Sequence, residues 1–465
     1  MLQTNENLTA TLLRLSGPIL AASALQTICQ TIDLIWVGRL DTESVATVGA
    51  CYPIIALLTG LYTGLLTATF VLVAQYCGAR DGVMLARVAA QSLVLLAITS
   101  IVFSSAAIVN ALPLLHLMGI DAALIKHATT YVRISLVGVG FVSAVGLYAS
   151  VMRGQSEVRA ALYMTALGAT LNMALDPVLI FGVGPISAGG VTGAAYATLL
   201  AQATTTVVAL RRLCRGDCGT KLRAKDFIPD IALMKQIILL GAPASFGACI
   251  DPVALLVFTG IVASFGTVAV AVNGVALRIF AFSVVLQTSI SSAIGILVGA
   301  AMGAGHTTRA QTIGARSTCT LFVISIALGV LAFSFAKPLV SIFVPPNTSV
   351  IMEGTRAVRW MAVCFPFVGT WLGLTGTFTS AGDTLFPMVS TFVIYWTVEI
   401  PLAWVLSRHT GMGTEGLWVT YPVSAFVGAL AGLVWFRLGR WKRMDLTGVQ
   451  RRIALGEADR TMIRT

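Results

Sequence analysis

The stretch Gln91–Val109 reads QSLVLLAITSIVFSSAAIV and contains no charged side chain. Cys319–Phe335 is a second run of this kind, in a chain that is 57% hydrophobic and only 11% charged. Soluble domains carry about 25% charged residues, so this chain has too little polar surface to face water on all sides. Helices of about 20 apolar residues cross a bilayer, whereas the strands of a membrane barrel would alternate apolar and polar residues. The sequence therefore predicts an all-α membrane protein.

About twelve apolar runs have the length of a membrane span. They centre on residues 12–37, 50–75, 88–110, 130–152, 160–182, 190–210, 236–264, 269–300, 312–335, 357–380, 386–407 and 416–436. The first follows a polar segment without a basic cluster and continues well past a stretch of small residues, so we expect a retained helix and no cleaved signal peptide. An even number of spans places both termini on the same side of the membrane.

The Lys and Arg residues predict the orientation of these spans. Most of the 30 basic residues fall in segments on the side of the N-terminus, and the two largest groups are in 211–235 and after residue 436. The positive-inside rule then places both termini in the cytoplasm, with the chain in a bacterial inner membrane. The net charge of +11 therefore indicates topology and contact with anionic headgroups of the bilayer. We expect no binding of nucleic acid.

The sequence repeats itself at a constant offset along the chain. The motif LSGP, which ends at Pro18, matches LGAP, which ends at Pro243, and at the same offset VATVG from Val45 matches VAVNG from Val270. Two parallel repeats of six helices are an established transporter design, in which the two halves move about a central binding site. We expect an N-lobe at 1–210, a basic cytoplasmic linker at 211–235, a C-lobe at 236–437 and a basic cytoplasmic tail at 438–465.

Five charged residues fall inside the predicted spans. A charge at the centre of a membrane helix costs at least about 2.5–3.5 kcal/mol, so each of these residues needs a functional or structural reason. They are Asp33, Asp176, Asp251, Glu399 and Arg278. The four His residues fall in loops or at the edges of spans, so carboxylates would have to carry any proton through the membrane domain.

Three polar stripes in the first half can converge, because residues three, four or seven apart lie on one face of a helix. Convergence would bring together two carboxylates, an amide oxygen and a hydroxyl, which are hard ligands suited to H⁺ or Na⁺. Two buried carboxylates cannot both ionise cheaply, so a coupling ion and an organic cation would compete for them, as antiport requires. The alternative is a hydrogen-bond cluster that only holds helices together. The stripes are Gln26, Gln30 and Asp33; Asn172 and Asp176; and Thr198 and Gln202.

The repeat favours the functional interpretation of this cluster. The second-half counterparts of Asp33, Asp176 and Thr198 are the residues Phe258, Ile400 and Tyr421. A purely structural device would be expected in both halves, so its presence in one half alone indicates a coupling site there.

A second site in the C-lobe is a weaker hypothesis. Asp251 and Glu399 could form it with Arg278 as a counter-ion, although an Arg–carboxylate pair of purely structural purpose is an equal alternative. In the first half, Pro18 lies four turns before Asp33 and can bend its helix. We therefore hypothesise that protonation of Asp33 changes this bend and with it the shape of the cavity.

The motifs taken together resemble the multidrug and toxic compound extrusion (MATE) family. The resemblance implies a V-shaped twelve-helix transporter that exports organic cations in exchange for H⁺ or Na⁺. It also implies that the N-lobe cation site consists of Asp33, Asn172, Asp176 and Thr198, and an acid at Asp176 resembles the DNA-damage-inducible-type bacterial branch. The motifs are DLIWVGRL from Asp33, ATVG from Ala46, NMALDP from Asn172, GAAYAT from Gly193 and AGDT from Ala381.

The sequence contains no G-x-x-x-x-G-K-[ST] loop, so energy has to come from an ion gradient rather than from nucleotide hydrolysis. It shows no arrangement of nucleophile and base or of metal ligands, so we expect neither an enzyme nor a cofactor. We predict a monomeric secondary active antiporter for multidrug efflux, with small organic cations as substrates. Two alternatives remain open: a flippase for a lipid-linked substrate from the wider superfamily, and an ion channel.

Overall fold

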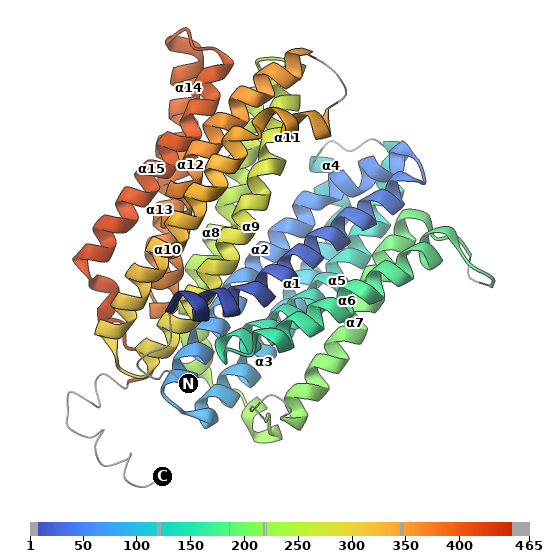
Figure 1. Cartoon of the computed structure of the whole chain (residues 1–465). Helices are drawn as coiled ribbons and strands as arrows, with labels where there is room; N and C mark the ends of the chain where they lie inside the picture. The colour runs from blue at the N-terminus through green and yellow to red at the C-terminus, as the bar shows by residue number, and fades with distance from the viewer. Residues whose placement is uncertain are drawn as a thin grey trace. The chain divides into compact units, whose positions relative to one another are not determined.

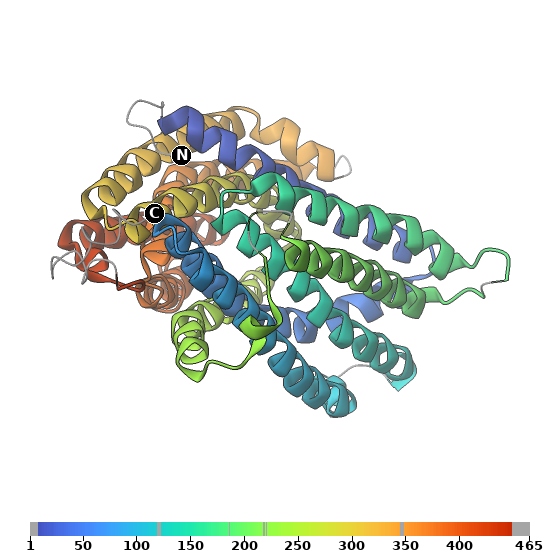
Figure 2. The same ribbon diagram turned by 90° about the horizontal axis from the view of Figure 1, so that it is seen from below.

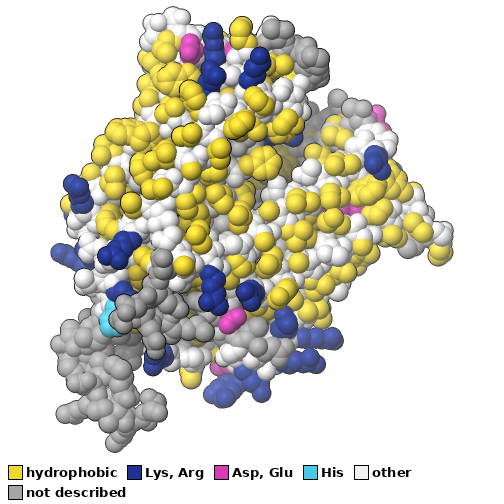
Figure 3. Space-filling view, in the orientation of Figure 1, with side chains coloured by type: hydrophobic (Ala, Val, Ile, Leu, Met, Phe, Trp, Pro, Cys, Tyr) yellow, Lys and Arg dark blue, Asp and Glu magenta, His cyan; other side chains and the backbone are white. Residues whose placement is uncertain are grey.

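The computed structural model describes residues 8–118, 122–185, 187–216, 219, 221–344 and 348–448. Within these ranges, 12 helices are long and apolar enough to cross a membrane, which confirms the twelve predicted spans. Several helices are longer than the predicted runs: α2 (Thr42–Gly78) and α9 (Thr267–Gly303) each have 37 residues. A helix of about 20 residues already spans about 30 Å, so both helices continue beyond the hydrocarbon. Apolar side chains cover the visible flanks of the helices, and Lys and Arg gather near the helix ends (Figure 3).

The chain forms two compact units, and the N-terminal unit comprises Ala21–Ser245. Helix α5 is central to it, because it packs against α2, α3, α6 and α7 (Figure 1). The elements of this unit are α1 (Leu8–Gly38) from Ala21 onward, α2, α3 (Gly82–Val109), α4 (Ala111–Leu117), α5 (Ala122–Gly154), α6 (Val158–Phe181), α7 (Gly190–Arg215), the 3-10 helix η1 (Ala224–Phe227) and α8 (Ile231–Ala263) as far as Ser245.

The C-terminal unit comprises Met1–Leu20 and Phe246–Thr465. Helix α12 is central to it and packs against α9, α10 and α15, as α5 does with its neighbours in the other unit. The elements of this unit are the first part of α1, the second part of α8, α9, α10 (Thr307–Ser334), α11 (Ala336–Phe343), α12 (Thr348–Ala381), α13 (Leu385–Phe392), the π-helix η2 (Val393–Glu399), α14 (Ile400–His409), α15 (Thr414–Leu438) and the 3-10 helix η3 (Arg440–Arg443).

The division between the units runs through the middle of α1 and α8. It falls after Leu20 in one helix and after Ser245 in the other, and these two positions are separated by the same offset as Pro18 and Pro243. Leu12 accordingly belongs to a core cluster with residues of α9, including Ile290. The hydroxyl of Ser245 donates a 2.6 Å hydrogen bond to the Leu61 carbonyl in α2. Compared with the predicted lobes, the N-terminal unit lacks residues 1–20 and also contains the predicted linker 211–235 and residues 236–245.

A pair of glycines shows that the repeat is also structural. A Cβ atom on Gly193 would lie 2.1 Å from the carbonyl oxygen of Leu179, and one on Gly416 would lie 2.6 Å from the carbonyl carbon of Leu406. In each half, the sixth span thus begins by crossing the backbone of the fifth at a distance that only glycine allows. The match of Gly193 with Gly416 in the sequence reflects this shared packing.

Aspartates fix the start of two helices. Asp41 accepts a hydrogen bond from the Ser44 N–H at 2.6 Å, and Asp81 accepts one from the Met84 N–H at 3.0 Å, so both act as N-caps. Asp41 precedes the membrane span of α2, and the hydrogen bond from the Ser44 backbone lowers the pKa of its carboxyl group. The cap therefore remains ionised at neutral pH.

The described part of the linker is held against α3 by one buried side chain, and Figure 2 shows the two segments crossing. Gln91, which is 1% exposed, donates from Nε2 to the carbonyls of Asp226 and Ile228, at 2.8 and 2.7 Å. Its Oε1 accepts a bond from the Asp230 N–H at 3.0 Å. Asp226 in turn accepts a 2.9 Å bond from the Arg223 N–H. This part of the predicted linker is therefore packed structure rather than a free loop.

Gln91→Leu is expected to release the linker, because three linker backbone groups would lose their partners. Each net hydrogen bond contributes about 0.5–1.5 kcal/mol, so opening of the linker should become at least about tenfold more frequent. The exposed Lys225 then becomes a better target for trypsin, and the rate of cleavage of the purified protein measures the effect. Thr99→Val is the control on the same helix, since the Thr99 hydroxyl bonds only within α3. Equal cleavage of both variants would contradict the prediction.

Candidate cation site

Two acids of the N-terminal unit meet between α1 and α6. Cys29 and Asn172 link the two carboxyl groups: the Cys29 Sγ lies 3.9 Å from Asp33 Oδ1 and from Asn172 Oδ1, and Asn172 is bonded to Asp176. Asp33 and Asp176 also interact electrostatically. Asp176 is 1% exposed and Asp33 is half-buried. Since ionised carboxylates only accept hydrogen bonds, two of them at close range repel each other unless a proton or another cation lies between them. The structure therefore brings together the two acids that the sequence singled out.

Asn172 orients Asp176 from one turn earlier on α6. Its Nδ2 donates a 2.9 Å hydrogen bond to Asp176 Oδ1, as the spacing of four residues predicts. The other oxygen of Asp176, Oδ2, is buried and has no hydrogen-bond donor. A buried acceptor without a partner is costly. A proton or a metal cation at Oδ2 would satisfy it.

Cys29 is a member of the cluster that sequence reasoning missed. Its Sγ lies 3.9 Å from Asp33 Oδ1, from Asn172 Oδ1 and from the Ala169 carbonyl oxygen. Cys29 is four residues before Asp33, and this spacing was the available signal. A thiol is a small, weak donor, so Cys29 fills the space between α1 and α6 without supplying a strong competing hydrogen bond.

The structure records no hydrogen bond that joins the remaining polar candidates to the acids in the described residues. The Thr198 hydroxyl donates to the Ala194 carbonyl of its own helix at 3.2 Å. Gln202 lies against α6, since a Cβ atom on Gly168 would be 3.5 Å from its Nε2. Gln26 and Gln30 are exposed. Gln26 and Gln30 are thus outside the buried cluster, and Gln202 lies at the contact between α6 and α7.

An apolar group lies at the α1 end of the cluster. Val37, Ile180 and Ala194 form a buried core there, and Trp36 packs against it. The Trp36 ring makes an edge contact with Phe181, with ring centres 5.9 Å apart. This packing joins α1, α6 and α7 beyond Asp33. It therefore fixes the spacing of the helices that carry the acids.

The acids of the C-terminal unit have different surroundings. Glu399 is buried at the end of the π-helix η2, and the Ser424 hydroxyl donates a 2.9 Å hydrogen bond to its Oε2. Asp251 is exposed, although it lies within electrostatic range of Glu399. Arg278 is also exposed, and in the described residues no ion pair joins it to either acid. The structure thus supplies Ser424, not Arg278, as the partner of Glu399.

The counterpart positions in the C-terminal unit hold an aromatic pair in place of the acid cluster. Phe258, the counterpart of Asp33, packs on Tyr421, the counterpart of Thr198, with ring centres 5.1 Å apart. The Tyr421 hydroxyl donates to Asn273 Oδ1 at 3.2 Å. The same spans therefore meet in both units. An aromatic pair fills the contact in the C-terminal unit, and the N-terminal unit has two acids at the equivalent positions.

The fold is that of a polytopic helical membrane protein built from a tandem repeat. The chain belongs to the MatE family, whose model matches it twice, over residues 18–178 and 243–405. The two matches begin at Pro18 and Pro243, the residues that identify the repeat in the sequence. Members of this family are transporters, so the chain is a transporter and not an enzyme.

Relatives and solved structures of similar length agree with this assignment. The chain is 25% identical to the probable multidrug resistance protein YoeA of Bacillus subtilis, over 92% of this chain and 93% of that protein. It is 23% identical to the probable multidrug resistance protein NorM of Thermotoga maritima, over 94% of each chain. A crystal structure of a MATE protein in complex with MaL6 superposes with a TM-score of 0.87 at 25% identity, over 93% of this chain and 96% of that one. The resemblance to MATE transporters is therefore confirmed.

Proposed function

We propose that this transporter is a secondary active antiporter, which exports lipophilic organic cations in exchange for H⁺ or Na⁺ and couples the two through Asp33 and Asp176. The observation that carries the proposal is the cluster in which Cys29 and Asn172 link the two acids, with Asp176 Oδ2 buried and without a donor among the described residues. Relatives named as multidrug resistance proteins support the class of substrate. Asn172 and Thr198 complete the proposed site.

Coupling would follow from competition for one charge. With a proton or Na⁺ at the acid pair, the pair carries too little negative charge to attract an organic cation. When the ion leaves, the exposed negative charge favours binding of the substrate instead. Alternating access would present the site to each side in turn, by movement of the lobes 1–210 and 236–437.

The ion gradient limits the export that this exchange can drive. One proton exchanged for one monovalent cation moves no net charge, so it gains only about 1.4 kcal/mol per pH unit. The membrane potential contributes only if a further coupling ion moves, at about 2.3 kcal/mol per charge and 100 mV. A second ion could occupy Glu399 and Asp251. We further propose that the monomer lies in a bacterial inner membrane with both termini in the cytoplasm, as the basic residues indicate.

Transport by everted membrane vesicles tests the proposal. Wild type, Asp33→Asn and the control Glu43→Gln, which changes an exposed acid at the start of α2, are expressed in a host without its own efflux pumps. Ethidium uptake is followed under an imposed pH gradient and then under a Na⁺ gradient. Uptake by wild type and the control, with loss in Asp33→Asn, is the expected result, and the effective gradient identifies the ion.

The other outcomes of this experiment separate the alternatives. Equal uptake by wild type and Asp33→Asn would exclude Asp33 from coupling. Vesicles that all behave like empty ones would exclude export of such drugs and point to a lipid-linked substrate. A current without any drug would indicate a channel.

Pro18 provides a test of the bending hypothesis. It lies inside α1, two residues before the point where that helix passes from one unit to the other. Proline cannot donate the helical hydrogen bond to the residue four positions earlier, so Pro18→Ala should favour a straight α1. We expect folded protein with ion-coupled uptake reduced at least about tenfold, which corresponds to a shift of about 1.4 kcal/mol between the two states. Pro53→Ala in α2 is the matched control, and normal uptake by Pro18→Ala would count against the hypothesis.

A further inference from the structure

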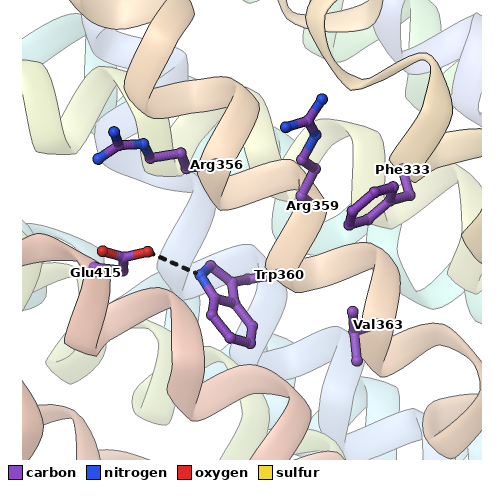
Figure 4. A pocket seen from close by; sticks show the side chains of 6 residues that line it. All are labelled: Phe333, Arg356, Arg359, Trp360, Val363 and Glu415. Atoms are coloured by element: carbon purple, nitrogen blue, oxygen red, sulfur yellow. Dashed lines mark hydrogen bonds between the residues drawn. The ribbon is translucent and has the colours of Figure 1, made fainter.

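A cavity of about 260 Å³ opens in the C-terminal unit among α10, α12 and α15 (Figure 4). Two arginines, two aromatic rings, a valine and a carboxylate surround it. The lining residues are Phe333, Arg356, Arg359, Trp360, Val363 and Glu415. None of them takes part in the proposed coupling mechanism.

The cavity lies at the level of a membrane surface. Phe333 is one residue before the end of α10, and Glu415 is the second residue of α15. Helix α12 continues from Arg359 to its last residue, Ala381. That segment makes about six helical turns, or about 33 Å, close to the thickness of the hydrocarbon core of about 30 Å. The cavity is therefore at the depth of the lipid headgroups.

The two guanidinium groups at this depth form no salt bridge with the described residues. Arg356 and Arg359 are three residues apart on α12, which places them on one face, and both are exposed. Figure 4 shows both side chains extending from the same stretch of α12. Within the part of the chain that the structure describes, no carboxylate lies within 4 Å of either group, the limit for a salt bridge. An anion beside these two like charges would be stabilised, and guanidinium groups fit phosphate especially well.

Apolar surface adjoins this pair of cations. The Arg359 guanidinium carbon lies 5.2 Å from the ring centre of Phe333, which is itself 46% exposed. Val363, one turn further along α12, is 44% exposed. An anion that carried a hydrocarbon chain would cover these side chains as well as the two charges. A phospholipid has both parts, a phosphate and an attached hydrocarbon chain.

The end of the cavity at Glu415 suits a cation. The Trp360 indole Nε1 donates a 3.5 Å hydrogen bond to Glu415 Oε1, and Figure 4 shows this carboxylate below Arg356, on the side away from Phe333 and Val363. A carboxylate beside an aromatic ring attracts an ammonium group through its charge and through the face of the ring. The cavity thus has separate places for a positive and a negative group.

We propose that this cavity is a lipid site for a phospholipid whose headgroup contains an ammonium group. Arg356 and Arg359 bind the phosphodiester, Glu415 and Trp360 bind the ammonium, and an acyl chain lies along Phe333 and Val363. The occupant is a membrane lipid and not free phosphate, because the apolar residues adjoin the cations. This inference is independent of the coupling ion.

Native mass spectrometry of the detergent-solubilised full chain tests the proposal. Phosphatidylethanolamine, phosphatidylglycerol and inorganic phosphate are titrated in turn. The variants are Arg356→Gln with Arg359→Gln, Glu415→Gln, and Lys337→Gln as a control that removes an exposed charge from α11 of the same unit. Thermal unfolding without added lipid shows that each variant is folded, and the conservative pair Arg356→Lys with Arg359→Lys replaces the first variant if it is not.

Wild type and Lys337→Gln should bind phosphatidylethanolamine about tenfold more tightly than phosphatidylglycerol, a difference of about 1.4 kcal/mol. The double arginine variant should lose at least about tenfold in affinity for both lipids. Glu415→Gln should lose only the preference between them. Unchanged lipid affinity in the double variant, or an unchanged preference in Glu415→Gln, overturns the proposal. Inorganic phosphate that binds as tightly as the lipids also overturns it, since the site would then recognise a free anion.

Discussion

Asp176→Asn is expected to reduce ion-coupled uptake of an organic cation at least about tenfold while the protein remains folded. The new amide keeps an oxygen that can accept the hydrogen bond from Asn172, and its nitrogen can donate to Asp33. In the variant, the amide nitrogen takes the place of the buried Oδ2 and needs no proton or cation as a partner. The competition on which the proposed exchange depends is lost.

The size of this effect follows from the strength of one charged contact. A hydrogen bond to a charged group contributes about 1.5–3 kcal/mol, so initial uptake should fall by a factor of about 10 to 150. Ethidium uptake by vesicles measures the rate. Binding of the drug to purified wild type should release protons if H⁺ is the coupling ion, and binding to Asp176→Asn should release fewer.

Glu399→Gln is the matched control for this prediction. It neutralises a buried acid of the other unit and retains an oxygen that can accept the bond from Ser424. If coupling lies in the N-terminal unit alone, this variant keeps most of the uptake. A loss as large as that of Asp176→Asn would show that the C-terminal acid is also needed for coupling. Normal uptake by Asp176→Asn would remove the basis of the proposed mechanism.

Gly64→Val should have the largest effect on folding. A Cβ atom on Gly64 in α2 would lie 2.1 Å from the carbonyl oxygen of Gly241 and 2.2 Å from the Ser245 Oγ in α8. The nearest obstacle is backbone, so a rotamer change cannot remove the clash. Overpacking typically costs about 1–3 kcal/mol and more where the surroundings cannot move, so we expect a cost of at least about 3 kcal/mol.

Yield of monodisperse protein and the midpoint of thermal unfolding measure this cost. Gly49→Val provides the control, because Gly49 is on the same helix and a Cβ atom there would have nothing within 4 Å. The Gly64 variant should give little folded protein, and the control should resemble wild type. Equal stability of both would mean that α2 and α8 do not cross at Gly64.

The spans and the repeat could be predicted because both depend on local composition. Apolar runs of about 20 residues show where helices cross, and Pro18 and Pro243 identify the repeat without any knowledge of contacts. The pairing of Asp33 with Asp176 was also predictable, since an acid in a span has to face a partner or a cavity. The short helices α4 and α11 were not among the predicted spans, because they are too short to leave a periodic signal.

The remaining features depend on contacts between distant residues. Gln91 is one polar residue within an apolar run, and only its position opposite the linker backbone shows its role. The partner of Glu399 is Ser424 rather than the predicted Arg278. This pairing depends on the register of the π-helix η2, which the local sequence does not specify. The lipid cavity likewise combines residues of three helices far apart in the sequence.

The division of α1 and α8 between the two units has a consequence for the history of the chain. Consider the chain cut between Arg215 and Lys221. The segment Leu8–Leu20 of the first fragment would belong to the unit formed by the second fragment, and Ile231–Ser245 of the second fragment would belong to the unit formed by the first. A single six-helix ancestor with this packing could complete its core only by exchanging its first helical segment with a second copy. Such an ancestor is expected to form a segment-swapped dimer, and fusion of two copies would make this exchange permanent.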